Sequence, residues 1–261
     1  MRKIAIQNLK GGSGKTVTAI NLTAALASLG NKVLLIDTDP QGSVGSSLGV
    51  RHEYSLYHLL LEDIKVTECI VHARENVDCV LSNKTLAMAE MQMMGVPRRE
   101  ELLRLRLAGL SGYDYVILDC SPSISLMHQN ALLYADELLI PVSMDFLALL
   151  GATQILESVK FINKYHDLHL QIAGFLPTFV DMRTNITTAV LEALKSTYGS
   201  TGKIFPPILV DANLLKAVAQ RKTIFEYNAK SRAAECFMQV ARVVSGQEET
   251  REEITVSDGA A

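Results

Sequence analysis

The fold is decided by one segment, Lys10-Gly11-Gly12-Ser13-Gly14-Lys15-Thr16. It follows an apolar run, Ile4 to Gln7, that has the length of a buried strand, and it leads into a segment of helical periodicity, Val17 to Leu29. Glycines let the backbone turn so that successive N–H groups point at phosphate oxygens, and the helix adds its positive N-terminal end. We therefore predict a phosphate-binding site between this strand and this helix.

The lysine and threonine that close the segment indicate a nucleotide triphosphate as the ligand. Lys15 is expected to neutralise the β- and γ-phosphates, and the hydroxyl of Thr16 is expected to bind Mg²⁺. An ordinary strand-to-helix turn is the alternative, but strand, loop, Lys-Thr pair and helix all agree with a P-loop. The expected cofactors are ATP and Mg²⁺, and the predicted contacts are Lys10, Gly11, Gly12, Ser13, Gly14, Lys15, Thr16 and Val17.

Carboxylates follow two further apolar runs. Val33 to Ile36 leads into Asp37-Thr38-Asp39, and Tyr115 to Leu118 leads into Asp119. Ligands of open α/β sheets bind at the C-terminal ends of strands, where these side chains would lie. We expect Asp119 to hold Mg²⁺ through water, and Asp37 to support the metal shell. Capping of the following helix is the alternative, above all for Asp37.

Two groups of roles follow from this arrangement. Asp39 is expected to orient the attacking water, and Lys15 to stabilise the phosphates during hydrolysis. The predicted catalytic residues are Lys15 and Asp39, to which the family resemblance given below adds Lys10, and the predicted metal residues are Thr16, Asp37 and Asp119.

Strand-sized apolar runs alternate with helix-length segments along the chain, and further runs occupy Leu138 to Val142 and Leu170 to Leu176. Parallel strands need crossover helices, so this order predicts an α/β fold with a mostly parallel twisted sheet and helices on both faces. We expect a single P-loop ATPase domain over residues 1–245. Residues 84–109 are expected to form two helices around Pro97.

Composition sets limits on the environment. No apolar stretch approaches the roughly 20 residues of a membrane-spanning helix, and no signal segment is predicted, so we expect a cytoplasmic protein. Four scattered cysteines without C-x-x-C spacing are expected to be buried free thiols. The net charge is −3, but residues 246–261 hold five acidic side chains and one basic side chain. That segment is predicted to be an acidic disordered tail, and the remaining chain can carry a basic face.

Lys10, at the start of the loop, is not needed by an ordinary P-loop. The pattern Lys-Gly-Gly-x-Gly-Lys-Thr resembles the deviant Walker A motif of the ParA/MinD superfamily, and the resemblance extends over residues 1 to about 245. It is closest to the ParA branch, whose members segregate plasmids, chromosomes and protein cargos. The matching segments are Asp37 to Gly42, Asp119 to Ser123, Ala135 to Val142, Thr178 to Thr184, Lys222 to Tyr227 and Lys230 to Glu235.

The resemblance implies a mechanism. In this family the first lysine reaches the nucleotide of a partner subunit, so Lys10 is expected to couple ATP binding to homodimer formation. The ATP dimer is expected to bind DNA nonspecifically and to be nucleoid-associated. Weak intrinsic hydrolysis is expected to be stimulated by a ParB-like or cargo-adaptor protein. Chromosomal members carry Pro-Arg-Asn near the adenine; Leu209-Val210-Asp211 stands there instead, and Asp211 is the residue assigned to nucleotide binding.

A basic cluster near the C-terminus is the candidate DNA surface. Glu226 is the only acidic residue between residues 216 and 232. Such a basic cluster can bind the phosphate backbone of DNA without recognising its base sequence. A solvated helical face is the alternative. A MinD-like or other positioning ATPase acting on a membrane or protein surface is the second functional hypothesis, although the acidic C-terminal segment argues against stable membrane anchoring. The candidate DNA-binding residues are Lys216, Arg221, Lys222, Lys230 and Arg232.

Overall fold

The computed structural model describes residues 1–62 and 64–247, so the predicted acidic tail lies, from residue 248 onward, outside the described residues. The described strands form one nine-stranded sheet in the order β3-β4-β2-β5-β1-β6-β7-β8, with β9 also paired to β7. Every strand pair is parallel except β3 with β4. The strands are β1 Arg2–Ile6, β2 Val33–Asp37, β3 Ile70–Arg74, β4 Val77–Val80, β5 Tyr115–Asp119, β6 Glu137–Ser143, β7 Gln171–Val180, β8 Lys203–Ile204 and β9 Ile208–Leu209.

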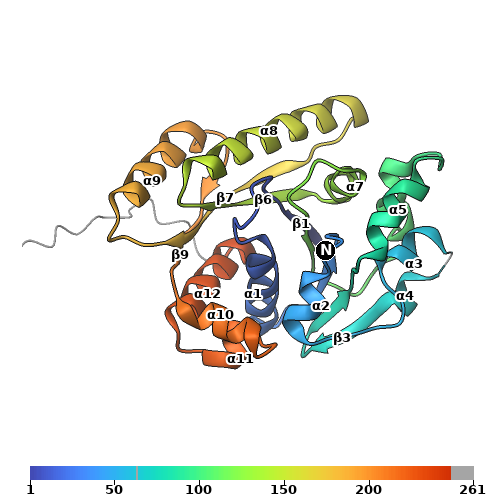
Figure 1. Cartoon of the computed structure of the whole chain (residues 1–261), viewed down its shortest axis with the longest axis horizontal. Coiled ribbons are helices and arrows are strands. Elements are labelled where there is room, and N and C mark those ends of the chain that lie inside the picture. Colours follow the sequence, from blue (N-terminus) through green and yellow to red (C-terminus); the bar gives the residue numbers. More distant parts are fainter. Residues whose placement is uncertain (63, 248–261) are drawn as a thin grey trace, which may run out of the picture.

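Helices cover both faces of this sheet, as the sequence predicted (Figure 1). On one face lie α1 (Lys15–Ser28), α2 (Ser43–Leu48), α10 (Ala212–Ala219), α11 (Ile224–Asn228) and α12 (Arg232–Ser245). The other face carries α3 (Leu56–Leu61), α4 (Val66–Cys69), α5 (Thr85–Met93), the short 3-10 helix η1 (Arg99–Glu101), α6 (Leu102–Arg106), α7 (Leu126–Tyr134), α8 (Phe146–His166) and α9 (Asn185–Tyr198).

The central strands are buried on both sides because successive side chains enter opposite cores. Ile4 and Ile6 of β1 pack with α1 and α12, whereas Ala5 between them packs with the helices of the other face. All five residues of β2 and of β5 are buried. Continuous apolar runs are the pattern expected for strands covered by helices on both faces.

Several elements differ from the sequence-based expectation. The short strands β3, β4, β8 and β9 were not predicted, and β7 continues to Val180, beyond the predicted end at Leu176. The break around Pro97 is confirmed, since α5 ends at Met93 and η1 begins at Arg99. The four cysteines are free and buried, as predicted. Within the part of the chain that the structure describes, no helix is long and apolar enough to cross a membrane.

Candidate nucleotide site

The predicted phosphate loop joins β1 to α1 at the C-terminal edge of the sheet, with β5 and β6 on either side of β1. Gly12 and Gly14 both have positive φ angles, of 75° and 85°. Gly14 caps α1, and a Cβ atom at this position would come within 3.1 Å of the Phe179 ring. A larger residue at position 14 would therefore strain the backbone and make a tight contact with the Phe179 ring.

Residues outside the loop fix its position. The hydroxyl of Thr178, on β7, donates a hydrogen bond of 2.9 Å to the carbonyl oxygen of Ser13. The side chain of Asn8 donates to the carbonyl oxygen of Pro141, and its Oδ1 accepts from the N–H of Lys10 at 2.9 Å. Asn8 could not be singled out from the sequence, because an asparagine after a strand gives no signal of its partners on a distant strand.

Lys15 is a buried cation that forms no ion pair with a carboxylate of the described residues. Its ammonium group donates to the carbonyl oxygen of Lys10 at 3.2 Å, and the residue is only 7% exposed. Burial lowers the pKa of Lys15, while the charge of nearby Asp119 acts in the opposite direction. An anionic phosphate in the loop would compensate this buried charge, which agrees with the role predicted for Lys15.

Asp119 provides the strongest evidence for a metal site. It lies beside Asp37, because β2 and β5 pair in a register that places the two aspartates opposite each other. Both carboxylate oxygens of Asp119 are buried without a hydrogen-bond partner in the described residues. Burial raises the pKa of Asp119 to about 7, with the nearby Thr16 hydroxyl acting in the opposite direction. Buried unpaired carboxylates are costly, and a divalent cation would satisfy this one.

The metal would complete its coordination mainly with ligands other than protein carboxylates. Among residues 1–62 and 64–247, no group of three or more His, Cys, Asp or Glu side chains could hold an ion by itself. Mg²⁺ in P-loop proteins is bound by a hydroxyl, phosphate oxygens and water, with a carboxylate in support. Thr16 and Asp119 fit that pattern.

Asp37 makes the hydrogen bonds expected if it caps the helix that follows β2, which was the alternative to a metal role. Its two oxygens accept hydrogen bonds of 3.0 Å from the N–H groups of Asp39 and Val44, so it holds the loop after β2 and the first turn of α2. Burial, followed by the charge of Asp119, raises the pKa of Asp37. The predicted support of the metal shell by Asp37 stays a prediction.

The loop that carries Asp39 has a defined conformation. The Oδ1 atom of Asp39 accepts from the N–H of Gln41 at 2.9 Å. Gly42 follows with a φ of 63°, and a Cβ atom there would approach the carbonyl oxygen of Ser82 to 2.7 Å. This loop is therefore pressed against the end of β4, a contact that the sequence did not reveal.

Lys10 is held within its own subunit. Its ammonium group forms an ion pair of 2.8 Å with Asp145 and lies 3.4 Å from the hydroxyl of Ser143. Asp145 also caps α8, since its other oxygen accepts from the N–H of Ala148. Burial acts to raise the pKa of Asp145, but the hydrogen bonds from Lys10, Ser143 and Ala148 outweigh burial and lower it. A Lys10 that reaches a partner subunit must first leave Asp145.

Asp211 has a structural role at the end of β9. One oxygen accepts from the N–H of Asn213 at 2.8 Å, which caps α10, and the other accepts from the N–H of Ala233 at the start of α12. Both oxygens are thus engaged, and its contribution to nucleotide binding stays a prediction.

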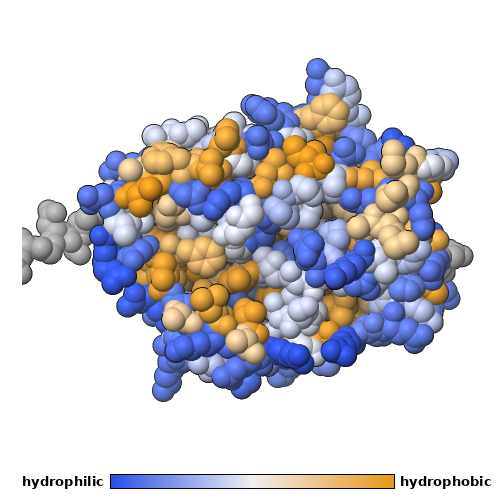
Figure 2. Space-filling view, in the orientation of Figure 1, coloured by the Kyte–Doolittle hydropathy of each residue, from blue (hydrophilic) through white to orange (hydrophobic). Residues whose placement is uncertain are grey.

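Hydrophobic residues gather on the surface over β9 and α10 (Figure 2), where Val210, Leu215 and Val218 are exposed.

The five predicted DNA contacts are all exposed, and they come from three parts of the chain. Lys216 is on α10, Arg221 and Lys222 lie between α10 and α11, and Lys230 and Arg232 lie at the start of α12. Their one acidic neighbour in sequence, Glu226, is paired with Arg74 at 2.6 Å.

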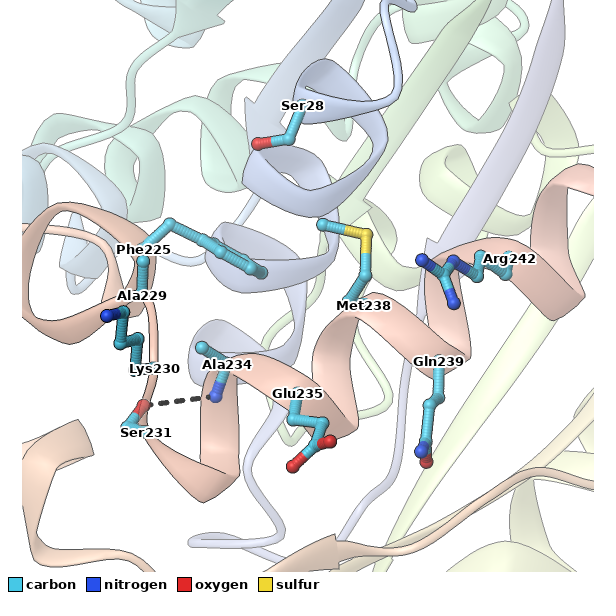
Figure 3. Close-up of a pocket in the computed structure, with 10 residues that line it drawn as sticks. All are labelled: Ser28, Phe225, Ala229, Lys230, Ser231, Ala234, Glu235, Met238, Gln239 and Arg242. Atoms are coloured by element: carbon cyan, nitrogen blue, oxygen red, sulfur yellow. Dashed lines mark hydrogen bonds between the residues drawn. The ribbon is translucent and has the colours of Figure 1, made fainter.

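Two of these residues, Lys230 and Arg221, line separate grooves. Lys230 lines a groove of about 610 Å³ between the end of α1, α11 and α12, in which Lys230 and Arg242 lie toward opposite ends (Figure 3). Arg221 lines a different groove, together with Gln41 and Lys84. Arg221 and Lys230 therefore line different grooves, and the predicted DNA surface stays a prediction.

Comparisons with known proteins agree with this geometry. A family described as "AAA domain" matches residues 1–172. The sporulation initiation inhibitor protein Soj of Bacillus subtilis strain 168 is 37% identical over 248 residues, which cover 93% of this chain and 97% of the relative.

Solved structures give the same result. A cobyrinic acid a,c-diamide synthase of Mycobacterium smegmatis, with an ATP analogue and magnesium, has 30% identity and a TM-score of 0.82, with 96% of this chain and 98% of that chain covered. Apo McdA of Cyanothece has 26% identity and a TM-score of 0.85, with 94% and 99% covered.

Proposed function

Since the chain belongs to the ParA and Soj family of P-loop ATPases, we propose that it binds ATP with Mg²⁺, dimerises in that state, and carries cargo on nonspecific DNA. The observation that carries the nucleotide part is a pair of buried charged groups at the loop: the ammonium of Lys15, whose one printed partner is a carbonyl oxygen, and the carboxylate of Asp119, whose oxygens have no hydrogen-bond partner in the described residues. A phosphate and a divalent cation, bound together, neutralise both at once. Relatives crystallised with an ATP analogue and magnesium support this choice of ligands.

Dimerisation is supported by the position of Lys10. Lys10 is a second lysine of the loop, and its partner Asp145 caps α8, two residues beyond the end of β6, and is not part of the loop itself. An ion pair that is about one third exposed is weak, so the phosphates of a partner's ATP can compete for Lys10. In the proposed dimer each Lys10 leaves Asp145 and contacts the nucleotide of the other subunit.

DNA binding is supported by the basic region on the α10–α12 side. Lys222, Lys230 and Arg232 are exposed, and none of them has an ion-pair partner among the described residues. Two subunits present twice as many cations, and each phosphate contact adds to affinity through counterion release. The ATP dimer therefore binds DNA more tightly than the monomer, without reading bases. A ParB-like or cargo-adaptor protein would then stimulate hydrolysis and release the complex.

The test is binding to a duplex DNA of arbitrary sequence with ATP, with ADP and without nucleotide, each over a series of salt concentrations. We expect salt-sensitive binding that is strong only with ATP. Replacement of Lys222, Lys230 and Arg232 by alanine should weaken it and flatten the slope of log affinity against log salt by about 0.9 for each phosphate that is no longer neutralised. The matched control removes three exposed lysines elsewhere, Lys32, Lys160 and Lys195.

Each outcome has a clear meaning. Binding that is equal in all nucleotide states would contradict the link between ATP and DNA. An equal reduction of affinity in the triple variant and in its control would remove the α10–α12 surface from the proposal, because the reduction would then reflect net charge alone.

A further inference from the structure

A second groove lies beside the Asp39 loop, outside the phosphate loop. It has a volume of about 430 Å³ and is lined by residues of the loop after β2, α2, the turn after α2, the end of β4 and the turn before α11. This volume is within the range of small-molecule sites, roughly 300 to 1,000 Å³. Glycines at positions 45 and 49 line it, which keeps this part of the wall free of side chains.

The charge of this groove is entirely of one sign. Arg51, Lys84 and Arg221 line it, and none of the described residues in its wall is acidic. The side chains of these three residues form no ion pair or hydrogen bond with any other described residue. Three cations that converge on one hollow without counter-charges repel one another, unless an anion joins them.

A buried hydroxyl adds a second, independent observation. Ser82 is 7% exposed and belongs to the wall of the groove, and its Oγ atom has no hydrogen-bond partner within residues 1–62 and 64–247. Buried hydroxyl groups are almost always paired, so this one lacks a partner that a ligand can supply. A phosphate oxygen would accept from it.

The backbone around Arg221 supports a site that is built into the fold. Arg221 has a positive φ of 58°, and its side chain lies so close to Gly49 that a Cβ atom there would meet it at 2.9 Å. The guanidinium of Arg74 donates to the carbonyl oxygen of Arg221 and so fixes this turn against α2. Non-glycine residues with positive φ are uncommon and concentrate at functional sites.

We propose that this groove binds a small phosphorylated molecule of mononucleotide size through Arg51, Lys84 and Arg221, with Ser82 as a hydrogen-bond donor. Its concave shape favours a small molecule over the backbone of duplex DNA, which would meet exposed side chains on a convex surface. The site is separate from the ATP site, but Gln41 and Gly42 form part of its wall. A bound ligand therefore contacts the loop that carries Asp39.

Pyridoxal 5′-phosphate is a suitable probe, because its aldehyde condenses with a lysine amine, with loss of water, wherever its phosphate is held nearby. Borohydride then reduces the imine to a stable secondary amine. Peptide mass mapping of the full-length protein separates Lys84 from the P-loop lysines, with exposed Lys195 as an internal reference. We expect Lys84 to be labelled at least about tenfold faster than Lys195, and pyridoxal without phosphate to show no such preference.

Variants and competitors locate the site. Arg51→Gln combined with Arg221→Gln should reduce labelling of Lys84 by roughly tenfold, whereas the control Arg104→Gln, at an ion-paired arginine of α6, should not. Inorganic phosphate and AMP should protect Lys84, and a short duplex DNA should not. Protection by DNA but not by AMP, or labelling of Lys84 at the rate of Lys195, would overturn the proposal. These readouts are independent of ATP-dependent dimerisation and DNA binding.

Discussion

Asp145→Asn is the most informative substitution, because it releases Lys10 and leaves the rest of the site in place. Lys10 and Asp145 are 2.8 Å apart, with side chains 29% and 34% exposed. Asparagine is as good a helix cap as aspartate, so the hydrogen bond from the N–H of Ala148 to the capping side chain at the start of α8 should persist. What the substitution removes is the charge that holds Lys10 in its own subunit.

The expected magnitude follows from the exposure of the pair. Partly exposed ion pairs contribute about 0.2 to 1 kcal/mol each, and formation of the proposed dimer breaks two of them. Asp145→Asn should therefore strengthen ATP-dependent dimerisation by roughly two- to thirtyfold in the dissociation constant. The assay is sedimentation velocity over a range of protein concentrations with ATP and Mg²⁺, in an Asp39→Ala background in which hydrolysis is expected to be blocked.

Asp136→Asn provides a matched control. It removes the same charge from another ion pair, between Lys3 and Asp136 at 3.0 Å, on the N-terminal side of the sheet. We expect this variant to dimerise like the parent protein. If the two variants dimerise equally, or if Asp145→Asn weakens the dimer, the intrasubunit contact of Lys10 does not oppose dimerisation and the reasoning is wrong.

Other predictions concern the same site and the core beside it. Lys15→Ala should abolish ATP binding measured by calorimetry, because the variant lacks the buried cation that faces the phosphates; retained affinity would move the phosphate site elsewhere. Asp39→Ala should bind ATP but hydrolyse it far more slowly, and a wild-type rate of phosphate release would exclude Asp39 from catalysis. Burial lowers the pKa of His128 to about 4 from its ordinary 6.5. Its neutral form therefore contributes stability that is full above pH 6.5 and is lost, by roughly 3 kcal/mol, as the pH falls to 4. Urea unfolding of the protein and of His128→Asn should differ in pH dependence by this amount between pH 6.5 and 4, and parallel curves would refute it.

The family and the chemistry of the loop could be predicted because they depend on local sequence. Glycine is favoured where a strand turns sharply into a helix around a phosphate, because it adopts positive φ angles without strain. Gly12 and Gly14 both have positive φ angles, as this rule requires. The parallel order of the central strands also follows from local pattern, since β1, β2 and β5 are continuous apolar runs. Asp119 was placed at a strand end by the same logic, and its unpaired oxygens agree with the metal role predicted for it.

Partners that lie far apart in the chain could not be predicted. The ion pair between Lys10 and Asp145 joins residues that are 135 positions apart, and nothing near either residue indicates it. The second contact of Asp211, with the N–H of Ala233 in α12, joins residues twenty-two positions apart. The basic residues near the C-terminus look like one cluster in the sequence, but Arg221 and Lys230 line two different grooves.

The sequence by itself therefore determined the class of fold and the place of the glycine-rich loop between β1 and α1, because backbone conformation and strand burial depend on a few consecutive residues. Only the tertiary structure decided which charges are paired. The sheet order brings β6 beside β1, so that Lys10 meets Asp145, and the packing of α2 against the turn after α10 places Arg221 with Arg51 and Lys84. Electrostatic interactions depend on distance in space, which consecutive residues do not specify.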